Sequence, residues 1–94
     1  MIRFVNDDAG YLEWIKANRG GYVLNLRQRR DPRYVILHRA TCKSISTERR
    51  FPGAYTERAY RKVCSADLGD LRSAAISEGR KDGSFSKRCG LCNP

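Results

Sequence analysis

Two short pairs of metal-ligand residues stand far apart in this sequence. One pair is His38 and Cys42, with three residues between them, and the other is Cys89 and Cys92, with two residues between them. Imidazole and thiolate are the ligands that Zn²⁺ takes in four-coordinate tetrahedral sites, which two such pairs commonly supply. The pattern H-x3-C…C-x2-C therefore predicts that the four side chains hold one structural zinc ion per chain.

Cys64 is the remaining cysteine, and it competes with the only histidine for a place in this site. A tetrahedral zinc ion takes four ligands, so either His38 or Cys64 is spare. We favour His38, because its spacing to Cys42 is a ligand spacing and Cys64 has no such neighbour. Cys64 follows Arg61, Lys62 and Val63 at the expected end of a strand and is also explained as a small buried side chain. It stays the alternative ligand.

The cysteines allow two other interpretations. Cys89 and Cys92 could form a redox pair, but no β-α-β pattern precedes them. The four cysteines could form two disulfides, but residues 1–8 do not resemble a secretory signal. No apolar run is long enough to span a membrane. We therefore expect reduced cysteines, a zinc site and a cytoplasmic protein.

The length and charge of the chain limit what it can be. Its 94 residues are enough for one domain, residues 1–94, with a core small enough that a metal ion would help to stabilise it. Lys and Arg number 19 against 10 Asp and Glu, a formal net charge of +9. Such an excess indicates a polyanionic partner, most simply nucleic acid, although a basic surface can also serve solubility alone.

The excess charge is unevenly placed. In residues 1–20 three basic and three acidic side chains cancel, so the whole excess lies in residues 21–94, mostly as arginine. The planar guanidinium suits phosphate and the edge of guanine. We expect duplex DNA to be contacted by the following side chains, with RNA left open: Arg27, Arg29, Arg30, Arg33, Arg49, Arg50, Phe51, Tyr55, Arg58, Arg61 and Lys62.

The apolar periodicity and turn signals predict an α+β fold with an antiparallel sheet and two helices. Capping residues at 6–8 and at 65 or 67 predict helices over about 9–18 and 67–77. Runs at 22–26 and 34–37 predict a hairpin with arginines at its tip. A further strand is expected over 58–64. The segment 44–56 has no clear period and is expected to be a loop.

The segments Leu37–Cys42 and Cys89–Pro94 together resemble the Ada-type zinc-binding domain, over roughly residues 35–94. That family has a first ligand pair spaced by three residues and a final C-x2-C followed closely by proline. The resemblance implies DNA contact and fusion to or association with a nuclease, in a restriction, modification-sensing or repair system. In the repair members the first cysteine of the spaced pair accepts a methyl group, and His38 stands at that position here.

Catalysis is not expected from this chain. Four good ligands describe a closed structural zinc site, whereas catalytic zinc keeps an open position. The leading hypothesis is a zinc-stabilised DNA-binding module. The first rival is a protein-interaction or scaffold domain whose basic face meets an acidic partner. The second is an Ada-like alkyl acceptor that acts through Cys42, Cys89 or Cys92.

Overall fold

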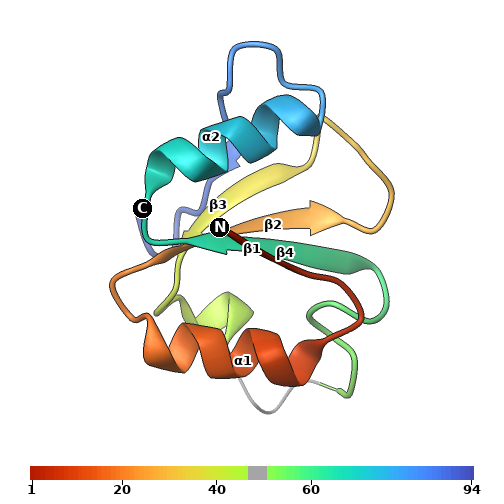
Figure 1. The fold of residues 1–94 in the computed structure, drawn as a ribbon, viewed down its shortest axis with the longest axis vertical. Helices are drawn as coiled ribbons and strands as arrows, with labels where there is room; N and C mark the ends of the chain where they lie inside the picture. The colour runs from red at the N-terminus through yellow and green to blue at the C-terminus, as the bar shows by residue number, and fades with distance from the viewer. Residues whose placement is uncertain (47–50) are drawn as a thin grey trace.

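A five-stranded sheet lies between two helices, one on each face, in this computed structural model (Figure 1). The structure describes residues 1–46 and 51–94. The elements in chain order are β1 (Ile2–Phe4), α1 (Asp8–Ala17), β2 (Tyr22–Arg27), β3 (Val35–Arg39), the short 3₁₀ helix η1 (Lys43–Ile45), β4 (Tyr60–Ser65), α2 (Leu68–Ser77) and β5 (Lys87–Arg88). The α+β fold is confirmed.

The sheet is mixed, which corrects the expectation of a purely antiparallel one. Its strand order is β1-β4-β2-β3-β5. The first three pairings are antiparallel, with Asn25 opposite Ile36 on β3 and opposite Lys62 on β4. At the other edge β5 runs parallel to β3, pairing Leu37 with Arg88. The chain reaches this edge because the segment after α2 returns along β3, and this return carries the last cysteine pair to the end of β3.

Side-chain oxygens begin both helices, as the sequence predicts. Asp7 accepts a hydrogen bond from the Gly10 N–H at 2.9 Å, and Asp67 accepts one from the Gly69 N–H at 2.8 Å. Such caps satisfy N–H groups that the first helical turn leaves unpaired. Gly79, just after α2, has φ +103°, a left-handed conformation that glycine adopts without steric cost.

The core consists of two layers, because the strands alternate between the two sheet faces. Val23 and Cys64 pack toward α1, in a cluster with Tyr11, Ile15, Ala40, Cys42 and others. Leu24, Leu26, Leu37 and Val63 pack toward α2, in a cluster with Leu71, Ala74 and Ala75. Residues that share the α1-side face of the strands, such as Asn25, Ile36 and His38, extend this face toward the metal-ligand residues.

The structure differs from the sequence-based expectation in a few details. The strand β5 is not among the strands predicted from the sequence, and β4 begins at Tyr60 instead of 58. On α2, Leu71, Ala74 and Ala75 are buried against the sheet, whereas Ile76 is exposed. Trp14 is partly buried and packs against the α1-side core. Within the described residues, neither helix has the length and apolar character needed to cross a membrane.

Candidate metal centre and the pocket beside it

Four side chains from three parts of the chain meet at one end of the sheet. His38 lies on β3, Cys42 precedes η1, and Cys89 and Cys92 follow β5. Their ligand atoms all lie within 4.8 Å of one another. The two residue pairs predicted from the sequence are therefore brought together, and they could coordinate one metal ion.

Three hydrogen bonds hold the two pairs against each other. The Cys89 N–H donates to the Leu37 carbonyl at 2.9 Å, which continues the parallel pairing of β5 with β3. The Arg39 N–H donates to Cys92 Sγ at 3.3 Å, and Arg39 Nε donates to the Cys92 carbonyl at 3.1 Å. Outer contacts of this kind orient metal ligands and stabilise the thiolate form of cysteine.

The spacing of the Cys42 and Cys89 sulfurs suits a shared metal ion and rules out a disulfide between them. Cys42 Sγ and Cys89 Sγ are 3.9 Å apart, and all four cysteines of the chain are free thiols. A disulfide needs an S–S distance of about 2.05 Å. Tetrahedral zinc with Zn–S bonds of about 2.3 Å places its sulfurs about 3.8 Å apart. The observed separation matches the second arrangement.

His38 is suited to ligation by its burial. The side chain is 6% exposed, and its Nδ1 has no hydrogen-bond partner among the described residues. Burial, and then the nearby ammonium groups of Lys62 and Lys87, lower the pKa of His38 to about 4. The ring is therefore neutral at pH 7, which is the form that binds a metal. A buried nitrogen without a partner is costly, and a bound ion would remove that cost.

Cys64 lies outside the cluster, so the structure gives no support to it as the fourth ligand. It is fully buried on β4, opposite Val23 on β2. Burial raises the pKa of Cys64 to about 12. Its thiol is therefore protonated at neutral pH and packs as part of the α1-side core.

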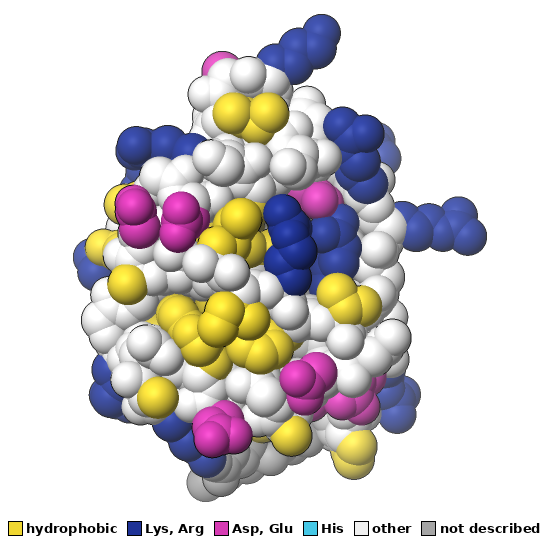
Figure 2. All heavy atoms as spheres, in the orientation of Figure 1, with side chains coloured by type: hydrophobic (Ala, Val, Ile, Leu, Met, Phe, Trp, Pro, Cys, Tyr) yellow, Lys and Arg dark blue, Asp and Glu magenta, His cyan; other side chains and the backbone are white. Residues whose placement is uncertain are grey.

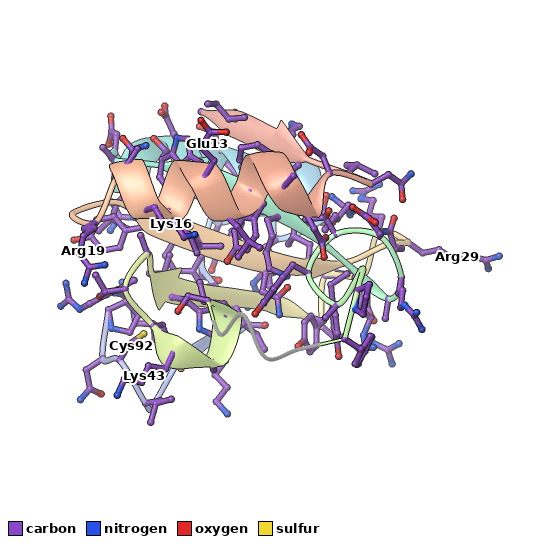
Figure 3. All side chains as sticks on the ribbon, turned by 90° about the horizontal axis from the view of Figure 1, so that it is seen from below. Glu13, Lys16, Arg19, Arg29, Lys43 and Cys92 are labelled. Atoms are coloured by element: carbon purple, nitrogen blue, oxygen red, sulfur yellow. The ribbon has the colours of Figure 1, made fainter. Side chains whose placement is uncertain are left out.

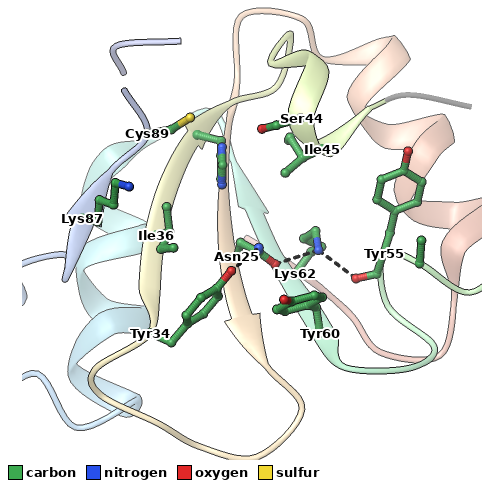
Figure 4. Close-up of a pocket in the computed structure, with 12 residues that line it drawn as sticks. Asn25, Tyr34, Ile36, Ser44, Ile45, Tyr55, Tyr60, Lys62, Lys87 and Cys89 are labelled. Carbon is green, nitrogen blue, oxygen red and sulfur yellow. Dashed lines mark hydrogen bonds between the residues drawn. The ribbon is translucent and has the colours of Figure 1, made fainter. Parts of the chain in front are cut away.

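A pocket of about 260 Å³ opens on the α1-side face of the sheet, next to the metal-ligand cluster. Figure 4 shows its lining, with Tyr34 and Tyr60 at one end and Cys89 and Ser44 at the other. Its floor is formed by side chains of β2, β3 and β4, and one wall by Ala54 and Tyr55. The pocket thus reaches from the hairpin end of the sheet to the metal centre.

Asp8 and Tyr11 of α1 hold the chain segments that form the pocket walls. The Asp8 carboxylate accepts hydrogen bonds from the Thr56 N–H at 2.6 Å and the Thr56 hydroxyl at 2.7 Å. The Tyr11 hydroxyl donates to the Ile45 carbonyl at 2.7 Å. These contacts hold η1 and residues 54–56 to α1, so the described walls of the pocket are attached to a helix.

Lys62 lies buried at the bottom of this pocket, with 2% of its side chain exposed. Its ammonium group donates to Asn25 Oδ1 at 2.7 Å and to the Tyr55 carbonyl at 2.8 Å. The rings of Tyr11, Tyr55 and Tyr60 surround it, with centroids 5.4 to 5.9 Å from Nζ. Hydrogen bonds and aromatic faces together offset part of the cost of burying an ammonium group.

The residues expected to contact nucleic acid fall into three groups. Six are exposed: Arg27, Arg29, Arg30, Arg33, Phe51 and Arg58. Three are buried or mostly so: Tyr55, Lys62 and Arg61, whose guanidinium pairs with Glu78. Arg49 and Arg50 lie outside the described residues. Figure 2 shows Lys and Arg side chains projecting around the outline of one face of the molecule. In Figure 3, Arg29 extends from the end opposite Cys92 and Lys43.

Eight of the side chains that line the pocket were not predicted from the sequence, among them Asn25, Tyr34, Tyr60 and Lys87. The only hint in the sequence is Asn25, a polar residue within the apolar run of β2. Tyr34 and Tyr60 stack on each other with centroids 5.7 Å apart, and the Arg27 guanidinium lies 4.4 Å from the centroid of Tyr34. The adjacency of these residues depends on strand register, which no local pattern specifies.

Comparison with known proteins identifies no relative of this chain. No protein-family model matches the chain, and no curated protein or solved structure matches it significantly. The functional assignment therefore depends on the metal-ligand cluster, the pocket and the distribution of charge.

Proposed function

We propose that this domain is a zinc-stabilised module that binds duplex DNA, with an Ada-type order of ligands. Three sulfurs and one imidazole form a donor set that suits zinc, because thiolates are soft ligands and zinc prefers tetrahedral geometry. The site would be structural, since four protein ligands leave no open position. In that role the ion ties the C-terminal segment to β3 and η1.

The observation that carries the DNA proposal is the exposed arginine cluster at the β2–β3 connection. Arg27, Arg29, Arg30 and Arg33 are all exposed there, and the connection holds one acidic residue, Asp31. Asp31 forms ion pairs with Arg27 at 3.7 Å and with Arg33 at 3.3 Å. Arg29 and Arg30 make no ion pair with a described residue, which leaves them available for phosphate oxygens.

A second cationic group lies along the same side of the sheet. Lys87 lines the pocket, and Lys43 is exposed at the metal-centre end. Together with the hairpin tip, these groups flank the pocket at both ends. Cationic groups at the two ends of the strands would contact phosphates at two places along one duplex.

The test is a titration of the zinc-loaded protein with a fluorescent duplex at several salt concentrations. The double variant Arg29→Ala/Arg30→Ala is compared with Arg3→Ala/Arg72→Ala, which removes the same charge from β1 and α2. If both hairpin arginines contact phosphate, the salt slope falls by about two units in the first variant, or about one per arginine. The control variant keeps the wild-type slope.

Two results would contradict DNA binding as the function. One is a wild-type affinity no higher than that of an unrelated protein of equal net charge. The other is an equal loss in both double variants, because that would reflect net charge without a defined surface. Either result would favour an acidic protein as the partner of the basic face.

A further inference from the structure

We propose that the outer edge of β1 is an interface at which two copies of this chain associate, so that their sheets join across a two-fold axis. This inference does not depend on DNA binding, and it concerns a face of the molecule that the proposed function does not use. β1 stands at one end of the strand order, so its outer side has no neighbouring strand among the described residues. The N–H and C=O groups along such an edge can pair with another strand.

Exposed hydrophobic side chains gather around this edge. Met1, Ile2 and Val5 make up half of the six exposed large hydrophobic residues in the described part of the chain. Figure 2 shows hydrophobic side chains in the middle of the face on which β1 lies in front of β4 (Figure 1). The other edge strand differs, because β5 consists of Lys87 and Arg88, and charged residues of this kind keep an edge from pairing.

The charge of this face allows two copies to approach each other. A formal net charge of +9 on each chain opposes self-association through most of the surface. In residues 1–20, however, the basic and acidic side chains cancel. Asp70 of α2 adds a negative charge beside the start of β1, where its Oδ2 lies 3.6 Å from the Met1 nitrogen. The β1 face is therefore close to neutral on a strongly basic molecule.

The two sides of β1 determine how a second copy would pair with it. Phe4 belongs to the α1-side core, so Ile2, two residues away, points to the same side. Arg3 points to the α2 side, because it lies opposite Val63. An antiparallel two-fold pair centred at Arg3 would place two guanidinium groups opposite each other, which is destabilising. A pair centred at Phe4 would extend past the end of β1 to Asn6, where the chain turns with φ +55°. Ile2 is therefore the centre of the pair.

This register makes the edge self-complementary in charge. With Ile2 at the axis, Arg3 lies opposite Met1 of the second copy, and therefore close to Asp70 of that copy. Arg3 makes no ion pair with a described residue of its own chain. The contacts of the Asp70 carboxylate, with the Met1 nitrogen and with the Ser65 hydroxyl at 2.7 Å, are both made by Oδ2, which leaves Oδ1 for a further donor. Two Arg3–Asp70 ion pairs, one on each side of the axis, form the isologous contact that a two-fold dimer needs.

The experiment measures the association of the zinc-loaded protein without DNA, by sedimentation equilibrium over a range of concentrations. Because the edge is short, we expect a weak dimer of the transient class, with a dissociation constant between about 10 µM and 1 mM. At the nanomolar concentrations of a fluorescence titration the chain is then monomeric, so the Arg3→Ala/Arg72→Ala control for DNA binding is unaffected.

Three variants test the register. Arg3→Asp and Asp70→Arg each place like charges across the axis, and each should weaken the dimer by about tenfold or more. The double variant Arg3→Asp/Asp70→Arg restores opposite charges and should associate as the wild type does. The matched control is Arg72→Asp, which makes the same change of charge on α2 beside Gly83 and Phe85 and should leave the dimer unchanged.

The inference is overturned if the wild type stays monomeric up to about 1 mM. It is also overturned if Arg3→Asp associates as strongly as Arg72→Asp, a comparison that holds even if the Asp70 variants are destabilised, because Arg3 is exposed. A folded double variant that stays as weak as the single ones would contradict the Arg3–Asp70 contact. DNA binding stands in each of these cases.

Discussion

Lys62 and Asn25 stand directly opposite each other on β4 and β2, and the lysine Nζ donates to the asparagine Oδ1 at 2.7 Å. Both side chains are more than 90% buried, on the face of the sheet that holds the metal-ligand cluster. This cross-strand pair therefore fixes a positive group inside the pocket, at a point set by the strand register.

We expect Lys62→Met to lower the free energy of unfolding by about 1–3 kcal/mol, because it leaves buried acceptors on Asn25 and Tyr55 without the lysine donor. Asn25→Leu should cost a similar amount. In a double-mutant cycle measured by urea denaturation, the two losses should be less than additive by at least about 0.5 kcal/mol. Full additivity would show that the two side chains stabilise the fold independently.

The zinc content of variants should distinguish the four cluster residues, which bind the ion, from Cys64, which does not. Purified wild type should contain one equivalent of zinc by elemental analysis, and Cys89→Ser should contain little or none. Because metal binding stabilises only the folded chain, loss of the ion should lower Tm by about 4–8 °C for each kcal/mol lost. Cys64→Ala should keep its zinc. A variant lacking Cys64 that loses its zinc while His38→Ala keeps it would assign the fourth position to Cys64.

The Arg61–Glu78 pair joins β4 to the end of α2 and is largely buried on both sides. Removing one partner leaves a buried charge uncompensated, so Arg61→Met should cost about 3–5 kcal/mol. Arg33→Met removes an arginine from the exposed pair with Asp31 and should cost less than about 1 kcal/mol. Equal losses in the two variants, measured by denaturant unfolding, would contradict the difference in burial.

Cys64 should make the stability of the protein depend on alkaline pH. Its folded pKa of about 12 lies above the usual thiol value of 9.0, so the unfolded chain loses this proton first. The stability that the protein owes to keeping this thiol protonated is fully present below about pH 9 and is lost as the pH rises toward 12. Cys64→Ala should therefore lose less stability than the wild type between pH 9 and 12.

A thiol reagent at pH 8 should modify Cys64 only after unfolding.

Gly79→Ala tests the left-handed turn after α2. A Cβ at this residue would meet Pro32 Cβ at 3.2 Å, and φ is +103°. Alanine in this conformation should cost about 1–2 kcal/mol. Gly20→Ala is the control, because a Cβ there meets no atom within 4 Å. If thermal unfolding shows the same small change for both variants, the turn after α2 relaxes without strain.

Local signals in the sequence were sufficient for the helices and most strands. Asp7 and Asp67 cap helices that begin within a residue of the expected positions. The ligand cluster was also predictable, because the spacing of its two pairs is itself a local feature. By contrast, β5 has only two residues and no periodicity to detect.

The pocket could not be predicted, because it depends on which side chains the strand register brings together. Arg61 and Lys62 are adjacent and equally basic in sequence, yet their side chains point to opposite faces of β4. One pairs with Glu78 at α2, and the other lies under the tyrosines. Charge counted along the sequence therefore overestimates the basic surface at these two residues.

The parallel strand β5 has a consequence for the behaviour of the protein without its metal ion. It covers the outer edge of β3 at Ile36 and Leu37, and the adjoining Cys89 is one of the cluster residues. An uncovered strand edge is a template for pairing with another molecule. If chelation releases β5, the first change would be self-association through β3, ahead of unfolding. Metal binding would then prevent aggregation, in addition to stabilising the fold.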